Sequence, residues 1–165
     1  MNDNPSFGSQ APHACESTKL IGDTMPIQVL LVEDSPGDVR LTREAFRDAN
    51  TSIQLHVASD GVEAMAFLKQ EGERVDAPRP DLILLDLNLP KKDGREVLSE
   101  IKSDVGLKTI PVVILTTSQA EEDILKSYHL HANCYVTKPV DLEKFIVVVQ
   151  SIDRFWLTIA TLPKT

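Results

Sequence analysis

The chain has 165 residues but only two cysteines and no long hydrophobic run. Cys15 and Cys134 are far apart and match no zinc-ligand spacing, which argues against a disulfide framework or a zinc finger. No uninterrupted apolar run is longer than the one at 145–149, whereas a membrane-spanning helix needs about 20 apolar residues. The N-terminus also lacks the basic and apolar regions of a secretory signal. We therefore expect a cytoplasmic protein with no membrane partner.

Positive charge is scarce as well. The chain has 17 Lys and Arg residues against 25 Asp and Glu residues, a net charge of −8. A nucleic-acid-binding protein needs a basic face for phosphates, so we expect no nucleic-acid partner. The apolar content of 42% and charged content of 25% are ordinary for a globular domain.

The first part of the chain differs in composition from the rest. Residues 1–24 are rich in small polar residues and have no apolar period, which predicts a disordered tail. Residues 25–165 are long enough for one domain. Met25 stands just before the first ordered segment and is an alternative start of the native chain, a choice that the sequence leaves open.

Short apolar runs alternate with segments of helical periodicity through the rest of the chain. We expect strands at 27–32, 53–57, 81–86, 110–115 and 134–137, each followed by a helix. This alternation predicts an α/β fold with a doubly wound five-stranded parallel sheet, in the flavodoxin-like order 2-1-3-4-5, and five helices. The final helix, starting near Asp141, is expected to be unusually long.

Polar side chains stand where the expected strands end. Glu33 and Asp34 follow the first strand, Asp86 the third, Thr116 the fourth and Lys138 the fifth. The carboxyl ends of parallel strands meet at one edge of a sheet, where such folds bind ligands. We therefore expect one functional site at this edge, although a structural network of ion pairs is an alternative reading of the same charges.

Three carboxylates in one cleft repel each other unless a cation compensates their charge. Mg²⁺ prefers oxygen ligands and keeps several waters. We expect Asp34 and Asp86 to bind it directly and Glu33 to act through water. The backbone carbonyl of Asn88 is a further candidate ligand.

The same residues suit phosphoryl transfer. The Asp86 carboxylate can act as a nucleophile and form an aspartyl phosphate. Catalysis of this step needs positioning and neutralised phosphoryl oxygens. Mg²⁺ would bind one oxygen, Lys138 a second, and the Thr116 hydroxyl or a backbone N–H near Thr117 the third.

Four segments in this order, VLLVEDSPGD, LILLDLNLP, VVILTTS and YVTKP, resemble the receiver domain of two-component response regulators, the CheY-like family. The resemblance covers about 26–155 and implies that Asp86 accepts a phosphoryl group from a sensor histidine kinase in a phosphorelay. It also implies that Thr116 and Tyr135 form the switch, that Lys138 is the family's invariant lysine, and that the protein is a signalling protein with at most weak autophosphatase activity.

Three local features qualify or narrow this resemblance. The family's acidic pair is Glu-Asp here, and the bond before Pro139, usually cis in the family, is expected to be cis. The stretch VEDSPGDVRLTREAF, with a long loop at 71–80, resembles single-domain regulators of phytochrome-type histidine kinases. Because the given sequence ends at Thr165, we expect no DNA-binding output domain.

Two other protein classes share parts of this pattern. A phosphatase of the haloacid dehalogenase kind also uses an Asp nucleophile and Mg²⁺, but it needs a second Asp where this chain has Asn88. A flavodoxin-like flavin module needs a phosphate-binding loop after the first strand, and the acidic sequence EDSPGD there would repel a phosphate.

The final helix has two apolar faces. The stripe expected to cover the sheet consists of Phe145, Val149, Ile152 and Trp156. A second face, made of Val148, Phe155 and Ile159, predicts a two-fold homodimer through this helix. The alternative is that the chain after Asp153 bends back and covers this face.

Overall fold

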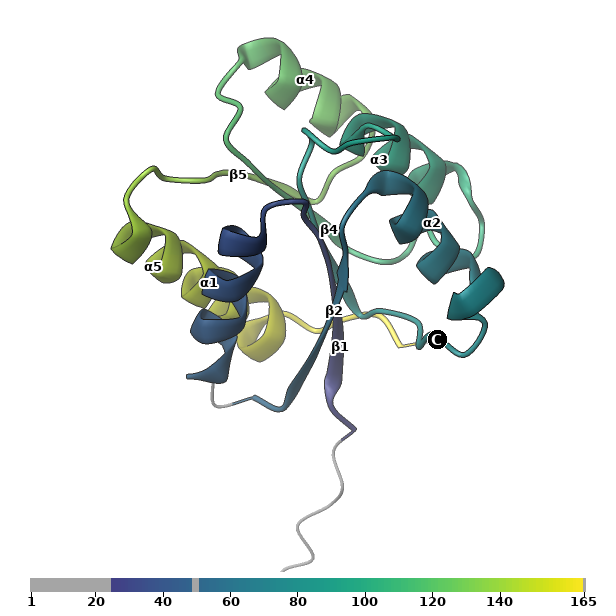
Figure 1. The fold of residues 1–165 in the computed structure, drawn as a ribbon, viewed down its shortest axis with the longest axis horizontal. Helices are drawn as coiled ribbons and strands as arrows, with labels where there is room; N and C mark the ends of the chain where they lie inside the picture. The colour runs from purple at the N-terminus through teal and green to yellow at the C-terminus, as the bar shows by residue number, and fades with distance from the viewer. Residues whose placement is uncertain (1–24, 49–50, 165) are drawn as a thin grey trace, which may run out of the picture.

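The computed structural model describes residues 25–48 and 51–164 (Figure 1). The tail predicted at 1–24 lies outside the described residues, so its disorder stays a prediction. Five parallel strands form one sheet in the order β2-β1-β3-β4-β5, as predicted. They are β1 (Ile27–Val32), β2 (Ile53–Ala58), β3 (Leu82–Leu85), β4 (Val112–Thr116) and β5 (Cys134–Thr137).

Five α-helices cover the two faces of the sheet. They are α1 (Pro36–Arg47), α2 (Gly61–Lys69), α3 (Gly94–Ser103), α4 (Glu121–His129) and α5 (Leu142–Ile152). Figure 1 shows α1 and α5 on one side of the sheet and α2 and α3 on the other. The predicted loop at 71–80 contains one short 3₁₀ turn, Gly72–Arg74. None of the helices in the described ranges is long and apolar enough to cross a membrane.

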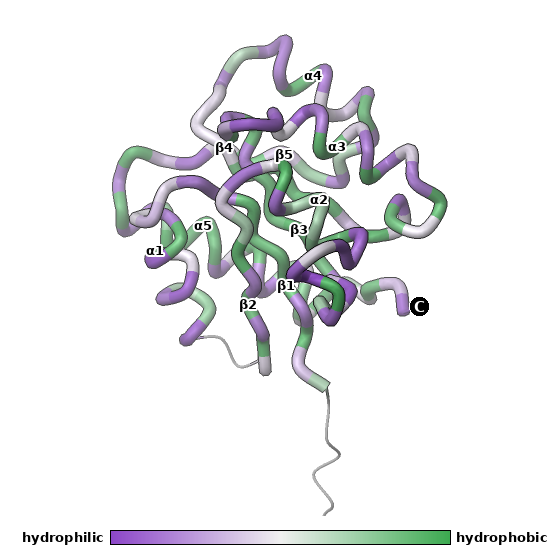
Figure 2. The backbone as a smooth tube through the Cα atoms, turned by 45° about the vertical axis from the view of Figure 1, so that its right-hand side comes forward, coloured by the Kyte–Doolittle hydropathy of each residue, from purple (hydrophilic) through white to green (hydrophobic). Residues whose placement is uncertain are grey.

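A hydrophobic core fills each side of the sheet. One buried cluster lies between the sheet and α2 and α3, and the other lies between the sheet and α1 and α5. All side chains of β3 and β4 are buried, which explains why their sequences are continuous apolar runs. The strands are mostly green in Figure 2, whereas the helices alternate between hydrophobic and polar residues.

Polar caps fix the start of four helices near the carboxyl edge of the sheet. The side chain of Ser35 accepts a hydrogen bond from the backbone N–H of Asp38, and Pro36 occupies the first turn of α1. Aspartates cap the other three, at Asp60, Asp93 and Asp141. Each cap satisfies a helix N–H group that has no partner within the helix.

The end of the last helix differs from the prediction. After α5 the chain continues as a π-helical segment, η2 (Asp153–Ile159). A π-helix bonds residues five apart, so the 3.6-residue period does not continue through it. Leu157 is therefore buried where Trp156, which is half-buried, was expected to be.

This change of period also divides the predicted second face. Val148 is half-buried against the cluster beneath α1 and α5, whereas Phe155 and Ile159 are exposed. Val148 is thus less open to solvent than the other two residues, and the assignment of all three to a dimer contact stays a prediction. The chain that follows does not cover the other two, so the bent-back alternative does not hold for them.

Candidate functional site

Three carboxylates converge where β1 and β3 end. In the sheet Val32 pairs with Leu85, which places Glu33 beside Asp86. Oxygens of Glu33, Asp34 and Asp86 lie within 4.8 Å of one another. Glu33 and Asp86 are buried and Asp34 is exposed, so the cluster opens to solvent on the Asp34 side. The convergence predicted from the strand ends is present.

Lys138, at the end of β5, lies beside these carboxylates and is almost fully buried. Its Nζ donates hydrogen bonds to Asp86 Oδ2 at 2.9 Å, to Asp38 Oδ2 at 3.0 Å and to Glu33 Oε2. Its backbone N–H donates to the carbonyl of Thr116 at 2.7 Å, which ties β5 to β4 at this edge. All three hydrogens of the ammonium group thus have carboxylate acceptors.

The charges at the site influence each other strongly. Burial raises the pKa of Glu33, although the nearby Lys138 ammonium partly offsets this. Burial also disfavours the charged form of Lys138, but its hydrogen bonds with Asp86 and Glu33 outweigh that cost and raise its pKa. The ammonium therefore stays charged at neutral pH, surrounded by more negative charges than it can balance.

This surplus of negative charge fits a divalent cation. Carboxylate oxygens are hard ligands of the kind that such cations prefer, and the exposed side of the cluster leaves room for coordinated waters. Asn88 is exposed, and its backbone N–H donates to Asp86 Oδ1 at 3.1 Å. This bond helps to orient the carboxylate, whereas the role of the Asn88 carbonyl as a ligand stays a prediction.

The two residues predicted as a switch are connected through a third one, Ser118. Thr116 is fully buried, and its hydroxyl lies 3.5 Å from the backbone N of Ser118, from which it accepts a long hydrogen bond. The hydroxyl of Tyr135 donates to the Ser118 carbonyl at 3.0 Å. The half-buried Tyr135 ring packs against the cluster beneath α2 and α3.

Ser118 also connects the site to α3 and α4. Its hydroxyl donates to Asp123 Oδ2 at 2.7 Å. Asp123 in turn forms a two-bond ion pair with Arg95, with Nε–Oδ1 at 3.0 Å and a second N–O distance of 2.7 Å. The loop after Thr116 is therefore tied to the start of two helices, a link that sequence reasoning missed.

Two further residues at the site were not predicted. Asp38 lies in the first turn of α1, four positions after Asp34, and only the packing of α1 against the sheet brings it to Lys138. Gly94 begins α3 against the backbone of Asp86, where a Cβ atom would lie 2.1 Å from the Asp86 carbonyl oxygen. A glycine shortly after the strand-ending aspartate is the only signal of this close approach that the sequence contains.

One local expectation was wrong. No peptide bond in the described residues is cis, so the bond between Lys138 and Pro139 is trans. Even before proline the trans form is favoured, by about 0.5–1 kcal/mol, and here it is compatible with the contacts of the Lys138 side chain.

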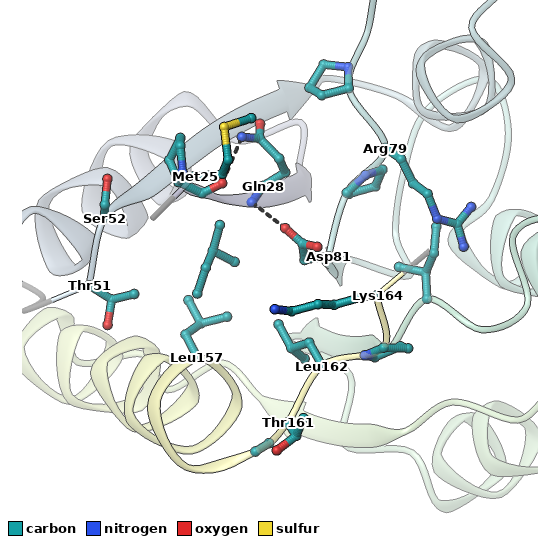
Figure 3. A pocket seen from close by; sticks show the side chains of 17 residues that line it. Met25, Gln28, Thr51, Ser52, Arg79, Asp81, Leu157, Thr161, Leu162 and Lys164 are labelled. Carbon is teal, nitrogen blue, oxygen red and sulfur yellow. Dashed lines mark hydrogen bonds between the residues drawn. The ribbon is translucent and has the colours of Figure 1, made fainter. Parts of the chain in front are cut away.

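The opposite edge of the sheet contains a wide hollow of about 1180 Å³ (Figure 3). The start of β1, the segment 78–81 and the chain after η2 line it, and Lys164 extends into it. Its one acidic lining residue, Asp81, accepts a hydrogen bond from the backbone N–H of Gln28 at 2.8 Å. Charges converge at the other edge, so the hollow is a weaker candidate for a reaction site in spite of its size.

Comparison with known proteins shows the family to which the chain belongs. The profile of the response regulator receiver domain matches residues 29–150. The chain belongs to this family. It is 55% identical over 138 residues to the response regulator Rcp1 of Synechocystis sp., covering 84% of this chain and 94% of Rcp1.

Solved structures give the same result. The Mn²⁺-bound form of Rcp1 matches with a TM-score of 0.83, and the phosphorylated cyanobacterial phytochrome response regulator RcpA with a TM-score of 0.82. Both are 55% identical to this chain and cover 84% of it, with 100% and 99% of their own chains covered. This chain is therefore a response regulator, a signalling protein that accepts a phosphoryl group in two-component signal transduction from a histidine kinase. The phosphatase alternative is not favoured.

Proposed function

We propose that Asp86 is the residue that accepts the phosphoryl group, with Mg²⁺ as the cation. The observation that carries this proposal is the hydrogen bond from the buried Lys138 ammonium to Asp86, inside a group of carboxylates open to solvent on one side. Asp34 and Asp86 would bind the cation directly, with Glu33 acting through water and the Asn88 carbonyl as a further ligand. The Mn²⁺-bound form of Rcp1 supports a divalent cation in this family.

In the transfer step, an Asp86 carboxylate oxygen forms a bond to phosphorus. The bond between phosphorus and the kinase's histidine nitrogen breaks, and its electron pair stays on the imidazole. A carboxylate needs no general base to act as the nucleophile. Asp34 and Asp86 would hold Mg²⁺, which would supply charge neutralisation for the phosphoryl oxygens. Lys138 donates to a second oxygen, and the Thr116 hydroxyl or a backbone N–H near Thr117 donates to the third.

The same contacts support a switch. Phosphorylation would draw the Thr116 hydroxyl toward the phosphoryl group and away from Ser118. Because Tyr135 is hydrogen-bonded to the Ser118 carbonyl, movement of this loop would release the Tyr135 ring and change the surface formed by α4, β5 and α5. A bistable element of this kind needs only one new charged group to shift it.

The phosphoryl group would leave slowly. Hydrolysis of an aspartyl phosphate is accelerated by an acid or base beside it, and Asn88, two positions after Asp86, cannot exchange a proton as a carboxyl group does. We therefore infer weak autophosphatase activity. The resemblance to regulators named for phytochromes supports a phytochrome-type histidine kinase as the donor. We place the protein in the cytoplasm, where ATP supplies such kinases.

A phosphorylation assay tests this function. The purified chain is incubated with Mg²⁺ and either acetyl phosphate or an autophosphorylated phytochrome-type kinase. We expect intact-mass spectrometry to show one added phosphoryl group, which hydroxylamine removes as it removes other acyl phosphates. A chain that gains no phosphoryl group from either donor would contradict the proposal.

We also propose a two-fold homodimer through α5 and η2. Phe155 and Ile159 are 52% and 65% exposed on η2, and Phe155 stacks edge-on against Trp156 with ring centres 5.4 Å apart. Fully burying such side chains is worth roughly 1.5–3 kcal/mol each, which favours covering them by a second copy. Half-buried Val148 would lie at the border of this contact.

Sedimentation measures this association directly. Wild type is expected to sediment as a dimer at tens of micromolar, and the double variant Phe155→Asp/Ile159→Asp as a folded monomer. Val62→Asp, at an exposed apolar position on α2, is the matched control and should leave the dimer intact. A monomeric wild type, with or without beryllofluoride, would refute the dimer.

A further inference from the structure

Asp38 is a fourth carboxylate at the site, and its place differs from that of the other three. It contacts Lys138 Nζ at 3.0 Å but is not a member of the group formed by Glu33, Asp34 and Asp86. It comes from α1, whereas the other three directly follow strands β1 and β3.

Both backbone polar groups of Asp38, its N–H and its carbonyl, form hydrogen bonds with side-chain hydroxyls of the same helix or its cap. Its N–H donates to the Ser35 hydroxyl at 3.3 Å, and its carbonyl accepts from the Thr42 hydroxyl at 2.8 Å. Thr42 is fully buried against the sheet side of α1. The Asp38 side chain is therefore presented to Lys138 by a fixed turn of helix.

The other two carboxylate partners of Lys138 are also candidate ligands of the cation. Glu33 and Asp86 both belong to the group of oxygens that suits a divalent cation. A cation bound there takes up their negative charge and repels the ammonium group. Asp38 is the one carboxylate partner of Lys138 that is not also in this group, so its bond to the ammonium can persist when a cation is bound.

We propose that Asp38 is a positioning residue for phosphorylation, a role that rests on the proposed function of this site. It anchors the Lys138 ammonium beside Asp86 while the cation occupies the carboxylate group. One ammonium hydrogen remains bound to Asp38, and another is directed at the incoming phosphoryl oxygen. Asp38 does not touch the phosphoryl group itself and acts through Lys138.

The anchor has a kinetic consequence. A lysine side chain has many rotamers, and without Asp38 the ammonium would be free to leave the site when the cation binds. Positioning errors of this kind slow a reaction without abolishing it. We therefore expect Asp38→Ala to be phosphorylated by acetyl phosphate roughly tenfold more slowly than wild type at saturating Mg²⁺. Saturation matters because loss of a nearby negative charge also weakens cation binding.

Three further variants make the comparison specific. Asp38→Asn keeps a neutral acceptor and should be intermediate, and Asp38→Glu keeps the charge and should recover most of the rate. Asp48→Ala removes the same side chain from the exposed end of the same helix and should react like wild type. If Asp38→Ala fails to fold, judged by circular dichroism, the Asn and Glu variants carry the test.

A second readout does not depend on the reaction. In ¹H–¹⁵N spectra of the lysine ammonium groups, the wild-type Lys138 signal should remain protected from exchange with water when Mg²⁺ is added. In Asp38→Asn it should broaden or disappear on the same addition. A purely structural role of Asp38 would leave the signal alike in both proteins.

The outcomes separate this inference from the function on which it rests. If wild type and Asp48→Ala are phosphorylated, and the Asp38 variants match them in rate and keep a protected Lys138 signal in Mg²⁺, Asp38 is not an anchor. If wild type itself gains no phosphoryl group, the proposed function fails, and the Lys138 spectra in Mg²⁺ still report whether Asp38 holds the ammonium.

Discussion

The two edges of the same sheet differ in how closely their charged side chains come together. At the carboxyl edge, Lys138 and its carboxylate partners are largely buried and contact one another directly. At the amino edge, a hollow of about 1180 Å³ has one acidic lining residue, Asp81, which accepts a hydrogen bond from the backbone N–H of Gln28. Few reactive groups converge at this hollow in spite of its volume, so charge and contact locate the site better than volume does.

The direction of the chain explains the difference. In a parallel α/β fold each strand leads into a loop and then into the start of a helix, so loops, helix caps and free N–H groups collect at the carboxyl edge. The positive ends of the helix dipoles favour anions there. The caps Ser35, Asp60, Asp93 and Asp141 mark these helix starts.

Two lysines make the contrast concrete. Lys138 at the carboxyl edge donates to carboxylates, and its pKa is raised. Lys102, at the end of α3, donates to the carbonyl of Ile110 at 2.8 Å and to Asn133 Oδ1 at 3.0 Å, and burial without a carboxylate lowers its pKa. A lysine thus forms ion pairs with carboxylates at one edge of the sheet and hydrogen bonds with uncharged acceptors at the other.

The largest expected effect is the loss of phosphorylation when the aspartate after β3 is replaced, compared with the aspartate before it. Asp86→Asn keeps the shape of the side chain but removes the nucleophile, so we expect no phosphoryl group to be added by acetyl phosphate and Mg²⁺. Asp81→Asn, the same change just before the other end of the strand, should be labelled like wild type. Intact-mass spectrometry measures both, and undiminished labelling of Asp86→Asn would reject Asp86 as the acceptor.

The next effect concerns stability at the charged edge. Lys138→Met leaves buried carboxylates without their counter-charge, and removing one partner of a buried ion pair costs about 3–5 kcal/mol. The loss should be smaller at pH 5 than at pH 8. Lys138 partly offsets the rise that burial causes in the pKa of Glu33, so without Lys138 this pKa rises further and the folded variant takes up a proton more readily than wild type as the pH falls. Urea unfolding at the two pH values, each with and without Mg²⁺, measures the difference. If the loss of unfolding free energy is the same at both pH values and with or without Mg²⁺, the substitution affects packing alone.

A smaller effect tests the close approach of α3 to the acceptor. Gly94→Ala would place a Cβ 2.1 Å from the Asp86 carbonyl oxygen, which forces the backbone to shift and costs roughly 1–3 kcal/mol. Gly37→Ala in the first turn of α1, where the Cβ would lie 3.7 Å from the Ser35 hydroxyl oxygen, is the control and should be nearly neutral. Thermal unfolding gives both values, and equal stability of the two variants would contradict the close contact.

The smallest expected effect is at the amino edge. Lys102→Met removes hydrogen bonds to neutral acceptors, which costs about 1 kcal/mol. Because the folded-state pKa of Lys102 is lowered, its contribution in wild type grows as the pH rises through that value. The contribution of Lys138 is complete below the ordinary lysine pKa and is lost as the pH rises through its raised folded value. In mildly alkaline solution the stability deficit of Lys102→Met should therefore grow as the pH rises, whereas the deficit of Lys138→Met should stay level.

Much of this arrangement was predictable because it depends on local pattern. Strand and helix periods, the caps at Ser35 and Asp60, and the acids that end β1 and β3 are all visible along the chain. The parallel topology then requires those acids, Thr116 and Lys138 to share one edge. The strand order and the convergence of Glu33, Asp34 and Asp86 followed from these facts alone.

Other features depend on contacts between segments that are distant in sequence. The bond between Asp38 and Lys138 joins residues 100 positions apart and depends on how α1 packs. The link from Ser118 to Tyr135 depends on the path of the loop after β4. The change to a π-helix at Asp153 defeated the assumption of a constant 3.6-residue period, which is why Trp156 was expected at the buried position that Leu157 occupies.

The sequence by itself determined which elements form, their order in the sheet and the edge at which the charges gather, because these follow from local periodicity and from the rules of parallel sheets. Only the tertiary structure decided which carboxylates share the Lys138 ammonium, where a backbone touches Asp86, and which apolar side chains remain uncovered. These outcomes depend on the packing of α1, α3 and η2, and their distances of a few ångströms arise from many contacts acting together, which no single stretch of sequence encodes.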